Sequence, residues 1–306
     1  MQLREIVRSG FMLVALATFA MAFKGIFARL IYQQQVSVNA LLIWRFALAV
    51  PLFWLAAGWI NRGKPKPPLN RRQWLLCGVT GMLFFVSAWC DFNAIDRLGA
   101  SLSRLLLYLF PALVMVLEAL EHRRMPTQAR LLVFAGAWLG IVLLLLPDWH
   151  GGTVEALGLV FGFGAASCYA LFWRTSQTLI QPLGSVRFNQ LSNSVTLVAM
   201  LLFLLPSLPV RELWISPTAL GWMVLMVVFS TVLPFFLLFE GLGRVNAAEA
   251  GMLTLFGPVV TVVVALWVFP DEQLAPLQWL GMAVVLVSVA SLKRMKGRRQ
   301  DGHRRG

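Results

Sequence analysis

Apolar runs of about 20 residues recur along the whole chain, and no other feature constrains the fold as strongly. An α-helix needs about 20 apolar residues to cross the roughly 30 Å hydrocarbon core of a bilayer. The 306-residue chain is 59% hydrophobic and only 13% charged, whereas a soluble domain carries about 25% charged residues. Runs such as LLLYLFPALVMVLEAL at 105–120 do not alternate between apolar and polar residues, which argues against a transmembrane β-barrel. The sequence therefore predicts an all-α integral membrane protein.

Ten transmembrane helices account for these runs. We expect them at residues 9–31, 40–59, 73–93, 99–120, 129–147, 155–178, 187–205, 217–239, 246–269 and 277–293. Their connections are short, so consecutive helices are expected to be antiparallel neighbours. The segment 1–22 has arginines before an apolar stretch, as a signal peptide does. Because the apolar character resumes after Lys24 and continues to Ile31, we expect an uncleaved first helix.

The distribution of positive charge supports this count of helices. Of the 26 lysines and arginines, the great majority fall in alternate connections, in the N-terminus or in the C-terminal tail. Connections rich in lysine and arginine stay on the cytoplasmic side, so we expect both termini to be cytoplasmic in a bacterial-type inner (plasma) membrane. The net charge of +13 is explained in this way without nucleic acid as a partner. The basic loop 61–72 is a candidate contact for anionic membrane lipids.

The two halves of the chain resemble each other. NAIDRLGASLSRLLLYLFPALVMVLEALE at 93–121 and EGLGRVNAAEAGMLTLFGPVVTVVVALWVF at 240–269 share a small-residue turn and a proline, and Pro111 and Pro258 lie 147 positions apart. We expect a first five-helix repeat at 1–150, a second at 151–293 and a basic cytoplasmic tail at 294–306. Because five is odd, the two repeats have inverted orientations. Inverted repeats are typical of secondary transporters, with the substrate site near the midplane between the repeats.

Several short motifs follow one another in a fixed order over residues 9–293. They are FKGIFARLIY, WRFALAVP and NAIDRLGASLSRLLLYLFPALV, then E-x₆-Q-x₇-G at Glu121, Gln128 and Gly136, then P-x₁₃-E at Pro258 and Glu272, and QWLG. With these motifs the chain resembles the EamA-type ten-helix transporters of the drug/metabolite transporter superfamily. The resemblance implies two inverted repeats around a central cavity, alternating access, and movement of small metabolites, often outward. Many relatives carry a Trp-Gly pair where Phe23, Lys24 and Gly25 stand here, so the resemblance does not name the substrate.

Three cations within the predicted helices are the first candidate substrate ligands. Lys24 lies about 14 residues into the first helix, roughly 21 Å along it. A charge at that depth costs on the order of 3 kcal/mol and usually faces a cavity or a partner. Arg45 and Arg104 lie nearer the non-cytoplasmic side, where an arginine can snorkel, and Asp91 is a candidate ion-pair partner for either. If all three cations face one cavity, its field favours a carboxylate or a phosphate; fixed ion pairs within the bundle are the alternative.

Five further side chains are candidate substrate contacts: Trp89, Tyr108, Tyr169, Asn189 and Asn193. Aromatic rings can stack on a ligand, but most in membrane proteins pack or anchor at the interface. Amides within a membrane helix either bond to neighbouring helices or line water. Asn193 takes the place of Arg45 when the halves are aligned through Gly10 and Gly158.

Acidic and proline residues near the helix ends have a structural and a functional interpretation. Glu118, Glu240 and Glu249 lie near the expected cytoplasmic ends. We expect each to be solvated or to pair with Arg123, Arg124 or Arg244; a cytoplasmic gate or proton site is the alternative. Pro111 and Pro258 are expected to kink their helices, because proline removes an intrahelical hydrogen bond.

No signature of a soluble enzyme is present. There is no P-loop, the three histidines lie in connections or in the tail, and Cys77, Cys90 and Cys168 have no metal-ligand spacing. We expect no catalytic activity, cofactor or metal. The sequence predicts a secondary transporter of a small polar or anionic organic metabolite, an amino acid or a related acid, with export implied by the resemblance. A multidrug efflux protein and a lipid scramblase or flippase are the alternatives, and proton coupling and the choice between monomer and homodimer stay open.

Overall fold

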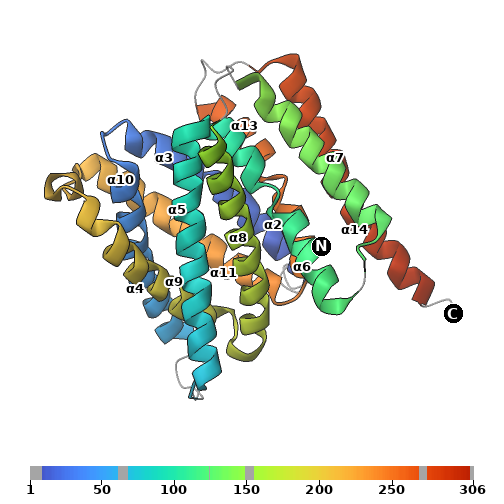
Figure 1. The fold of residues 1–306 in the computed structure, drawn as a ribbon, viewed down its shortest axis with the longest axis horizontal. Coiled ribbons are helices and arrows are strands. Elements are labelled where there is room, and N and C mark those ends of the chain that lie inside the picture. The colour runs from blue at the N-terminus through green and yellow to red at the C-terminus, as the bar shows by residue number, and fades with distance from the viewer. Residues whose placement is uncertain (1–8, 61–67, 124, 149–154, 269–273, 304–306) are drawn as a thin grey trace. The chain divides into compact units, whose positions relative to one another are not determined.

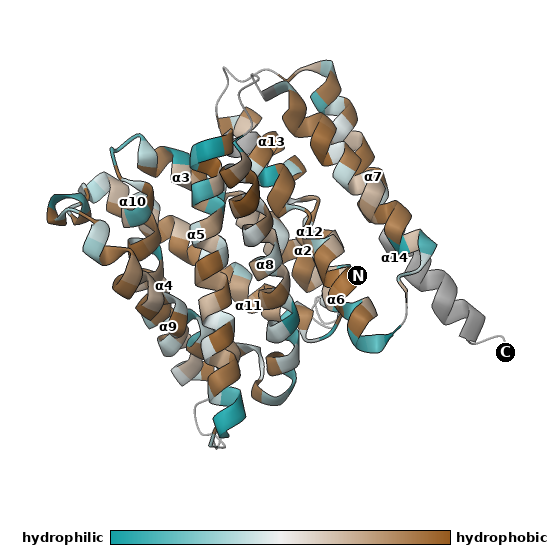
Figure 2. Cartoon of the chain, viewed as in Figure 1, coloured by the Kyte–Doolittle hydropathy of each residue, from teal (hydrophilic) through white to brown (hydrophobic). Residues whose placement is uncertain are grey.

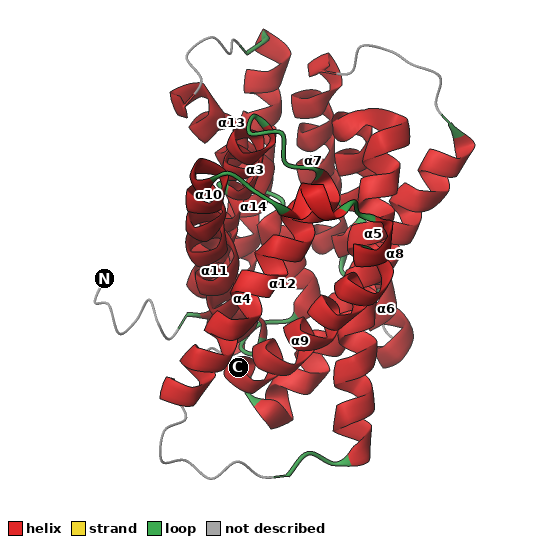
Figure 3. Ribbon diagram, turned by 90° about the vertical axis from the view of Figure 1, so that its left-hand side faces the viewer, coloured by secondary structure: helices red, strands yellow, loops and turns green. Residues whose placement is uncertain are grey.

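The structure is a computed structural model, and helices joined by turns and loops make up the part of the chain that it describes (Figure 3). Described are residues 9–60, 68–123, 125–148, 155–268 and 274–303; for 99–101 and 292–303 only the backbone is described. Some sequence features lie outside these ranges: the N-terminal arginines, most of the basic loop, Arg124 and Glu272. The side chains of the basic tail lie outside them as well.

The helices follow one another along the chain with short connections (Figure 1). In order they are α2 (Gly10–Ala22), α3 (Lys24–Tyr32), α4 (Val38–Ile60), α5 (Arg71–Leu107), α6 (Phe110–His122), α7 (Gln128–Leu145), η1 (Leu146–Asp148), α8 (Ala156–Leu183), α9 (Ser185–Phe203), η2 (Leu205–Ser207), η3 (Val210–Leu213), α10 (Pro217–Val227), η4 (Val228–Val232), α11 (Leu233–Leu242), α12 (Ala247–Thr254), α13 (Gly257–Val268) and α14 (Pro276–His303). Of these, η4 is a π-helical turn and the other η elements are 3₁₀ turns.

The described helices confirm the all-α membrane class. Nine helical segments are long and apolar enough to cross a bilayer, and the apolar part of α14, Pro276–Ser291, follows them in the chain. Hydrophobic residues predominate along these helices (Figure 2). Each of the ten predicted membrane helices has a counterpart. The third and sixth run furthest beyond their expected ends, to Leu98 and Leu183.

The helices form two compact units, and each unit contains segments from both halves of the sequence. The first unit comprises Met1–Val86 and Leu171–Val245, and the second comprises Ser87–Ala170 and Asn246–Gly306. In the first unit α2 packs against α11, α4 against α9 and α3 against α10. In the second unit α7 packs against α14, visible as the green and red pair in Figure 1, and α6 packs against α12.

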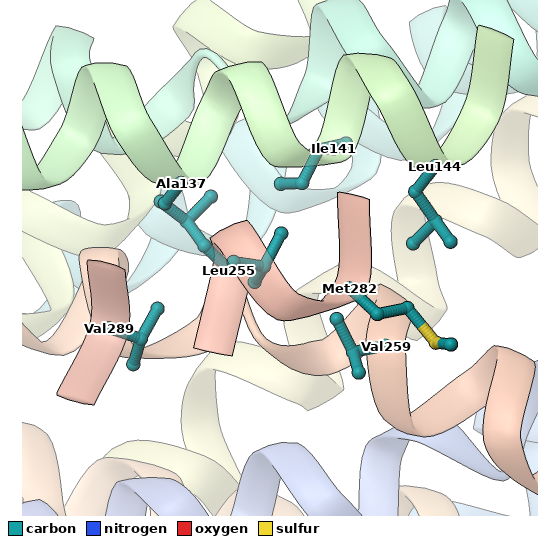
Figure 4. Close-up of a cluster of buried hydrophobic side chains, with 8 residues drawn as sticks. Ala137, Ile141, Leu144, Leu255, Val259, Met282 and Val289 are labelled. Carbon is teal, nitrogen blue, oxygen red and sulfur yellow. The ribbon is translucent and has the colours of Figure 1, made fainter. Parts of the chain in front are cut away.

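Glycines allow helix backbones to touch in both units. A Cβ on Gly281 of α14 would stand 2.6 Å from the carbonyl oxygen of Gly140 in α7. A Cβ on Gly241 of α11 would stand 2.9 Å from the carbonyl oxygen of Gly10 in α2. Small residues at helix crossings are a common packing device in membranes, because apolar burial alone does not drive helices together there. Buried apolar side chains of α7, α13 and α14 form a cluster in the second unit, together with Leu255 from the break before α13 (Figure 4).

Two membrane helices of the second unit are broken at matching places. Between α5 and α6 the helix is interrupted at Tyr108 and Leu109, and between α12 and α13 at Leu255 and Phe256. In each break the backbone tightens to bonds across three residues, such as Leu109 N–H to Leu106 C=O at 3.0 Å. Pro111 and Pro258 stand in the first turn after the breaks, the places where the sequence predicts kinks.

Candidate functional site

Arg45 is buried in α4 of the first unit and bonds to a π-helical turn. Its exposed fraction is 6%, and its Nε donates a hydrogen bond to Thr231 Oγ1 at 2.9 Å. Thr231 lies in η4, between α10 and α11. The ring of Pro234 clashes with the carbonyl of Ser230, four residues earlier, in a regular helix; a π turn at this place relieves that conflict. The proline therefore shapes the backbone that receives Arg45.

The same π turn is tied to the first membrane helix. Ser230 Oγ donates to the carbonyl oxygen of Ala20 in α2 at 3.1 Å, and Ser230 is fully buried. Lys24 follows Ala20 by about one helical turn and is the first residue of α3, after α2 ends at Ala22. Lys24 is half-buried. The interrupted first helix and the π turn of the eighth therefore lie next to each other within the first unit.

Asn189 and Asn193 are buried in α9 and use their amides as helix contacts. Asn189 Nδ2 donates to the carbonyl oxygen of Phe235 in α11 at 3.3 Å, and Asn193 Nδ2 donates to the carbonyl oxygen of Asn189 at 2.8 Å. Their exposed fractions are 0% and 4%. The Asn189 bond corresponds to the helix-bonding alternative, whereas the Asn193 bond stays within α9. The structure places no solvent-facing amide at either position.

Phenylalanine rings border Arg45 in the first unit. The Arg45 guanidinium carbon lies 5.3 Å from the ring centre of Phe46, and Phe84 joins Phe46 to Phe172 and Phe235 by ring contacts. Further rings extend this phenylalanine cluster: Phe53, Phe188, Phe236 and Phe239. A cation next to aromatic faces gains attraction to the rings, so the cluster supplies an apolar wall beside a positive charge.

In the second unit Asp91 forms an ion pair with Arg104. Asp91 Oδ2 lies 3.2 Å from Arg104 Nη2, and the side chains are 12% and 34% exposed. Ser103 Oγ donates to Asp91 Oδ1 at 3.3 Å. Twelve residues of straight helix would separate Asp91 from Ser103 by about 18 Å, so α5 is not straight. The chain turns back within it, between the membrane segments Arg71–Leu98 and Leu102–His122. The sequence analysis named Arg45 and Arg104 as possible partners of Asp91, and the structure pairs Asp91 with Arg104.

The two tyrosines predicted as substrate contacts, Tyr108 and Tyr169, lie near this ion pair. Tyr108 lies close enough to Arg104, Asp91 and Tyr169 to interact electrostatically with each. Tyr169 packs edge-on against Phe110, with ring centres 4.8 Å apart. We call Asp91, Ser103, Arg104, Tyr108 and Tyr169 the Asp91 cluster. Three of its members, Arg104, Tyr108 and Tyr169, were each predicted as substrate contacts from the chemistry of their side chains.

The contacts of Trp89 that the structure describes are with residues outside the Asp91 cluster. Its side chain is 44% exposed, and its ring packs edge-on against Phe161 at 5.4 Å. The Arg97 guanidinium carbon lies 5.1 Å from the same Phe161 ring, and Arg97 also lies 3.7 Å from Glu155. An exposed indole beside a cation is the arrangement of an interface anchor.

Three carboxylates near the expected cytoplasmic ends of the helices bind either a backbone N–H at the start of a helix or an arginine. Glu118 Oε1 accepts the Ala248 N–H at 3.0 Å, in the first turn of α12. Glu249 pairs with Arg130 of α7 at 2.7 Å. Glu240 pairs with Arg244, as predicted. The partner of Glu249 is a residue that sequence analysis did not name, because Arg130 comes from a different helix.

Sequence analysis also missed Ser230 and Thr231. The sequence signal that could have identified them is their position four and three residues before Pro234, inside an apolar run. Such a pair marks a place where side chains can replace lost backbone bonds. Among the described residues, no three His, Cys, Asp or Glu side chains are arranged to hold a metal ion.

Comparison with family models and solved structures adds a second line of evidence. The model of the EamA-like transporter family matches residues 8–146 and matches again at 156–293. A crystal structure of a protein superimposes on 95% of this chain and 98% of its own with a TM-score of 0.77, at 16% sequence identity. At that identity the superposition supports the fold alone.

Curated relatives are also transporters by name. The uncharacterized transporter YcbK of Bacillus subtilis is 27% identical over 296 residues, which cover 94% of each chain. The uncharacterized transporter YwfM of Bacillus subtilis is 24% identical and covers 77% of each chain. The uncharacterized transporter sll0355 of Synechocystis is 25% identical, covering 78% of this chain and 77% of its own.

Proposed function

Because the chain belongs to the EamA-like transporter family, we propose that it carries a small polar or anionic organic metabolite across the inner membrane by alternating access. An amino acid or a related organic acid is the substrate class. The observation that carries this choice is Arg45, a guanidinium that is 6% exposed and lies within the membrane helix Val38–Ile60. A cation is kept inside a membrane helix at a cost of several kcal/mol, which function usually justifies.

The bonds of Arg45 support a role in recognition. Its Nε is held by Thr231, which fixes the plane of the guanidinium. A fixed planar fork is suited to a carboxylate, which it can bind through two parallel hydrogen bonds. Lys24 is our second candidate ligand, because it stands at the interruption of the first helix, one turn from the residue that Ser230 contacts.

Interrupted helices support alternating access as the mechanism. Helices that are broken near a substrate site are common in secondary transporters. The described helices of this chain are interrupted by the π turn η4 and by the breaks at Tyr108 and Leu255. We infer that substrate exchanges its hydration shell for fixed polar contacts and that the broken helices bend as access alternates. Export is the direction that we expect, with both termini cytoplasmic.

A thermal-stability screen of the purified protein tests the substrate class. A ligand that binds only the folded state stabilises it by about 2.7 kcal/mol at a hundredfold excess over its Kd. The library contains amino acids, organic acids, nucleotides and cationic drugs. We expect carboxylates to raise the melting temperature of the wild type and to lose this effect in Arg45→Lys, which keeps the charge but not the fork.

Arg72→Lys is the matched control, because Arg72 is exposed at the start of α5 and should retain the ligand effect. Stabilisation by cationic drugs alone would contradict the proposal and indicate multidrug efflux. Movement of fluorescent lipids between leaflets of reconstituted vesicles, without stabilisation by any soluble ligand, would indicate a scramblase instead. Uptake of the stabilising carboxylate into proteoliposomes, absent in Arg45→Lys, would support transport directly.

A further inference from the structure

A buried glutamine of α9 carries a carboxamide that the described protein does not use. Gln190 is 8% exposed and belongs to the membrane helix Ser185–Ser207. The side-chain hydrogen bond that the described residues form with it goes from Ser194 Oγ to its main-chain carbonyl at 2.7 Å, not to its carboxamide. Neither polar atom of that carboxamide is fully enclosed. A buried amide without a partner lowers stability, so its presence calls for a ligand or another explanation.

Asn193, about one turn further along α9, has a second unused polar atom. Its Nδ2 donates to the carbonyl oxygen of Asn189 at 2.8 Å, and because a carbonyl can only accept, this bond identifies the amide nitrogen. The Asn193 Oδ1 is therefore an acceptor, and no described residue supplies it with a donor. Residues three apart are neighbours on a helix surface. We call the Gln190 carboxamide and the Asn193 Oδ1 the amide pair.

The contacts of α9 on either side of the amide pair show which way it faces. Asn189 Nδ2 donates to the Phe235 carbonyl of α11 at 3.3 Å, and Ser194 Oγ accepts from Trp54 Nε1 of α4 at 3.0 Å. At 3.6 residues per turn, the amide pair lies about 40° and about 100° around the helix from Asn189, and Ser194 lies about 140° from it. The amide pair therefore lies between the contact with α11 and the contact with α4.

Phenylalanine rings join α4 and α11 at the same level. Phe53 precedes Trp54 in α4, and its ring centre lies 6.2 Å from that of Phe235 and 5.4 Å from that of Phe236. Because α9 touches both helices and they touch each other through these rings, the amide pair faces the rings. All of these residues belong to the first compact unit.

The oxygens and the rings together favour a cationic N–H donor as ligand. Asn193 offers an oxygen because its nitrogen is occupied, and the Gln190 carboxamide carries an oxygen of the same kind. The faces of phenylalanine rings attract a cation and repel an anion. A primary ammonium group meets both conditions, since it has three N–H donors and a positive charge. A carboxylate has neither a donor nor a positive charge.

We propose that the amide pair is an ammonium-binding subsite and that Gln190 distinguishes an ammonium group from a hydroxyl of similar size. The two oxygens accept N–H donors of the ammonium, and the rings stabilise its charge. This inference rests on the proposed function and deepens it, because it assigns a second group of the substrate. A carboxylate at Arg45 and an ammonium at the amide pair together select an amino acid over the hydroxy acid of the same shape.

The two subsites lie close enough for one small molecule to occupy both. Thr231 accepts from Arg45, and Phe235, whose carbonyl accepts from Asn189, follows Thr231 by four residues. Four residues of helix rise about 6 Å. A small amino acid bridges such a distance when each of its ends is hydrogen-bonded.

Simple amines test the subsite by itself, through thermal shifts of the purified protein. Butylammonium has N–H donors, whereas butyltrimethylammonium has the same charge and none. We expect butylammonium to bind the wild type about tenfold more tightly or better, as a hydrogen bond to a charged group predicts. Gln190→Met should reduce this ratio to about one, because methionine has nearly the same shape but no amide oxygen. Gln190→Glu retains oxygen acceptors and should retain the preference.

The ligand-free variants give a second, independent result. Gln190→Met should unfold at the wild-type temperature or above it, because no described protein partner is lost. Asn189→Leu should unfold at a lower temperature, because it removes the donor to the Phe235 carbonyl. Gln34→Met is the matched control, since Gln34 is exposed in the turn after α3 and should keep the amine preference of the wild type.

Three outcomes would overturn the proposal. They are a wild type that does not prefer butylammonium, a Gln190→Met variant with an unchanged preference, and a clear loss of stability in ligand-free Gln190→Met. The last result would mean that the carboxamide is bonded within the protein. Gln190→Leu repeats the comparison if the methionine variant cannot be purified.

Pairs of amino acids and 2-hydroxy acids of the same shape separate this inference from the proposed function. We expect the wild type to be stabilised more by the amino acid of each pair and Gln190→Met to respond equally to both. If no carboxylate stabilises the wild type, the proposed substrate class fails and the amine comparison still decides the subsite. If the amine comparison is negative, recognition of a carboxylate by Arg45 is unaffected.

Discussion

Tyr108 and Leu255 lie 147 positions apart, and each is the first residue of a break in a membrane helix of the second unit. In each case the helix resumes two residues later, and a proline stands in its first turn, Pro111 or Pro258. The separation is the same one that relates the two prolines in the sequence. The internal repeat is therefore present in the backbone as well as in the residue pattern.

Replacing the prolines tests whether the breaks are used in transport. Pro111→Ala and Pro258→Ala each restore a backbone N–H and permit a continuous helix. Proline in a first helical turn is well tolerated, so we expect the melting temperature to change little. Transport into proteoliposomes should fall severalfold in each variant. Unchanged transport in both would mean that the breaks only serve packing.

The contact between Arg45 and Thr231 predicts a difference between two small substitutions. Thr231→Val keeps the shape but removes the acceptor of a buried, charged hydrogen bond, which is worth about 1.5–3 kcal/mol. Thr231→Ser keeps the hydroxyl and should cost less. Thermal unfolding in one detergent measures both. A loss in Thr231→Val no larger than the loss in Thr231→Ser would mean that the hydrogen bond to Arg45 adds little to stability.

The touching backbones of α7 and α14 predict that Gly281 does not tolerate a methyl group. In Gly281→Ala the new Cβ would stand 2.6 Å from the Gly140 carbonyl oxygen and 2.7 Å from the Leu144 nitrogen. Overpacking of this kind costs about 1–3 kcal/mol. Gly78→Ala and Gly221→Ala are matched controls in helices, because nothing lies within 4 Å of either Cβ. The controls should be neutral or stabilising, since alanine favours helix by about 1 kcal/mol. A stable Gly281→Ala would contradict the close contact.

The carboxylate of Glu118 predicts a stability effect at the start of α12. Glu118 is 8% exposed and accepts the Ala248 N–H at 3.0 Å. The Ala248 N–H also donates to Asn246 Oδ1 at 3.0 Å, so Glu118→Ala removes one of its two acceptors and should cost about 0.5–1.5 kcal/mol. Glu118→Gln retains an oxygen acceptor and should lose less. Hydrogen exchange of the Ala248 amide is the second measurement, and faster exchange is expected in the alanine variant alone.

The membrane helices could be predicted from sequence because bilayer thickness fixes their length. Each predicted helix has a counterpart, from Gly10–Tyr32 to Pro276–Ser291. The helix breaks were also predictable, since Pro111 and Pro258 interrupt backbone bonding wherever they stand. These features depend on local chemistry and on the solvent, so no knowledge of the neighbouring helices was needed.

The partners of the polar residues could not be predicted in the same way. Asp91 was equally suited to Arg45 and to Arg104 by charge, and the reversal of the chain before Ser103 made the choice. Arg45 bonds to Thr231, which lies 186 positions later in the chain. Thr231 belongs to a π turn that the sequence analysis did not predict. Asn189 and Asn193 were candidates for a water-lined cavity, but they bond to backbone carbonyls. Substrate contact by any of the eight predicted residues stays a prediction.

The packing of α2 against α11 also bears on how the protein is made. Gly10 meets Gly241 in the finished structure, yet Gly241 is synthesised long after Gly10. At about 5–20 residues per second the first helix waits roughly ten to fifty seconds for its partner. During that time its small-residue face and Lys24 have no eighth helix to contact. The first unit is therefore completed late in translation, and a ribosome that stalls before α11 would leave the first helix as an early target for membrane quality control.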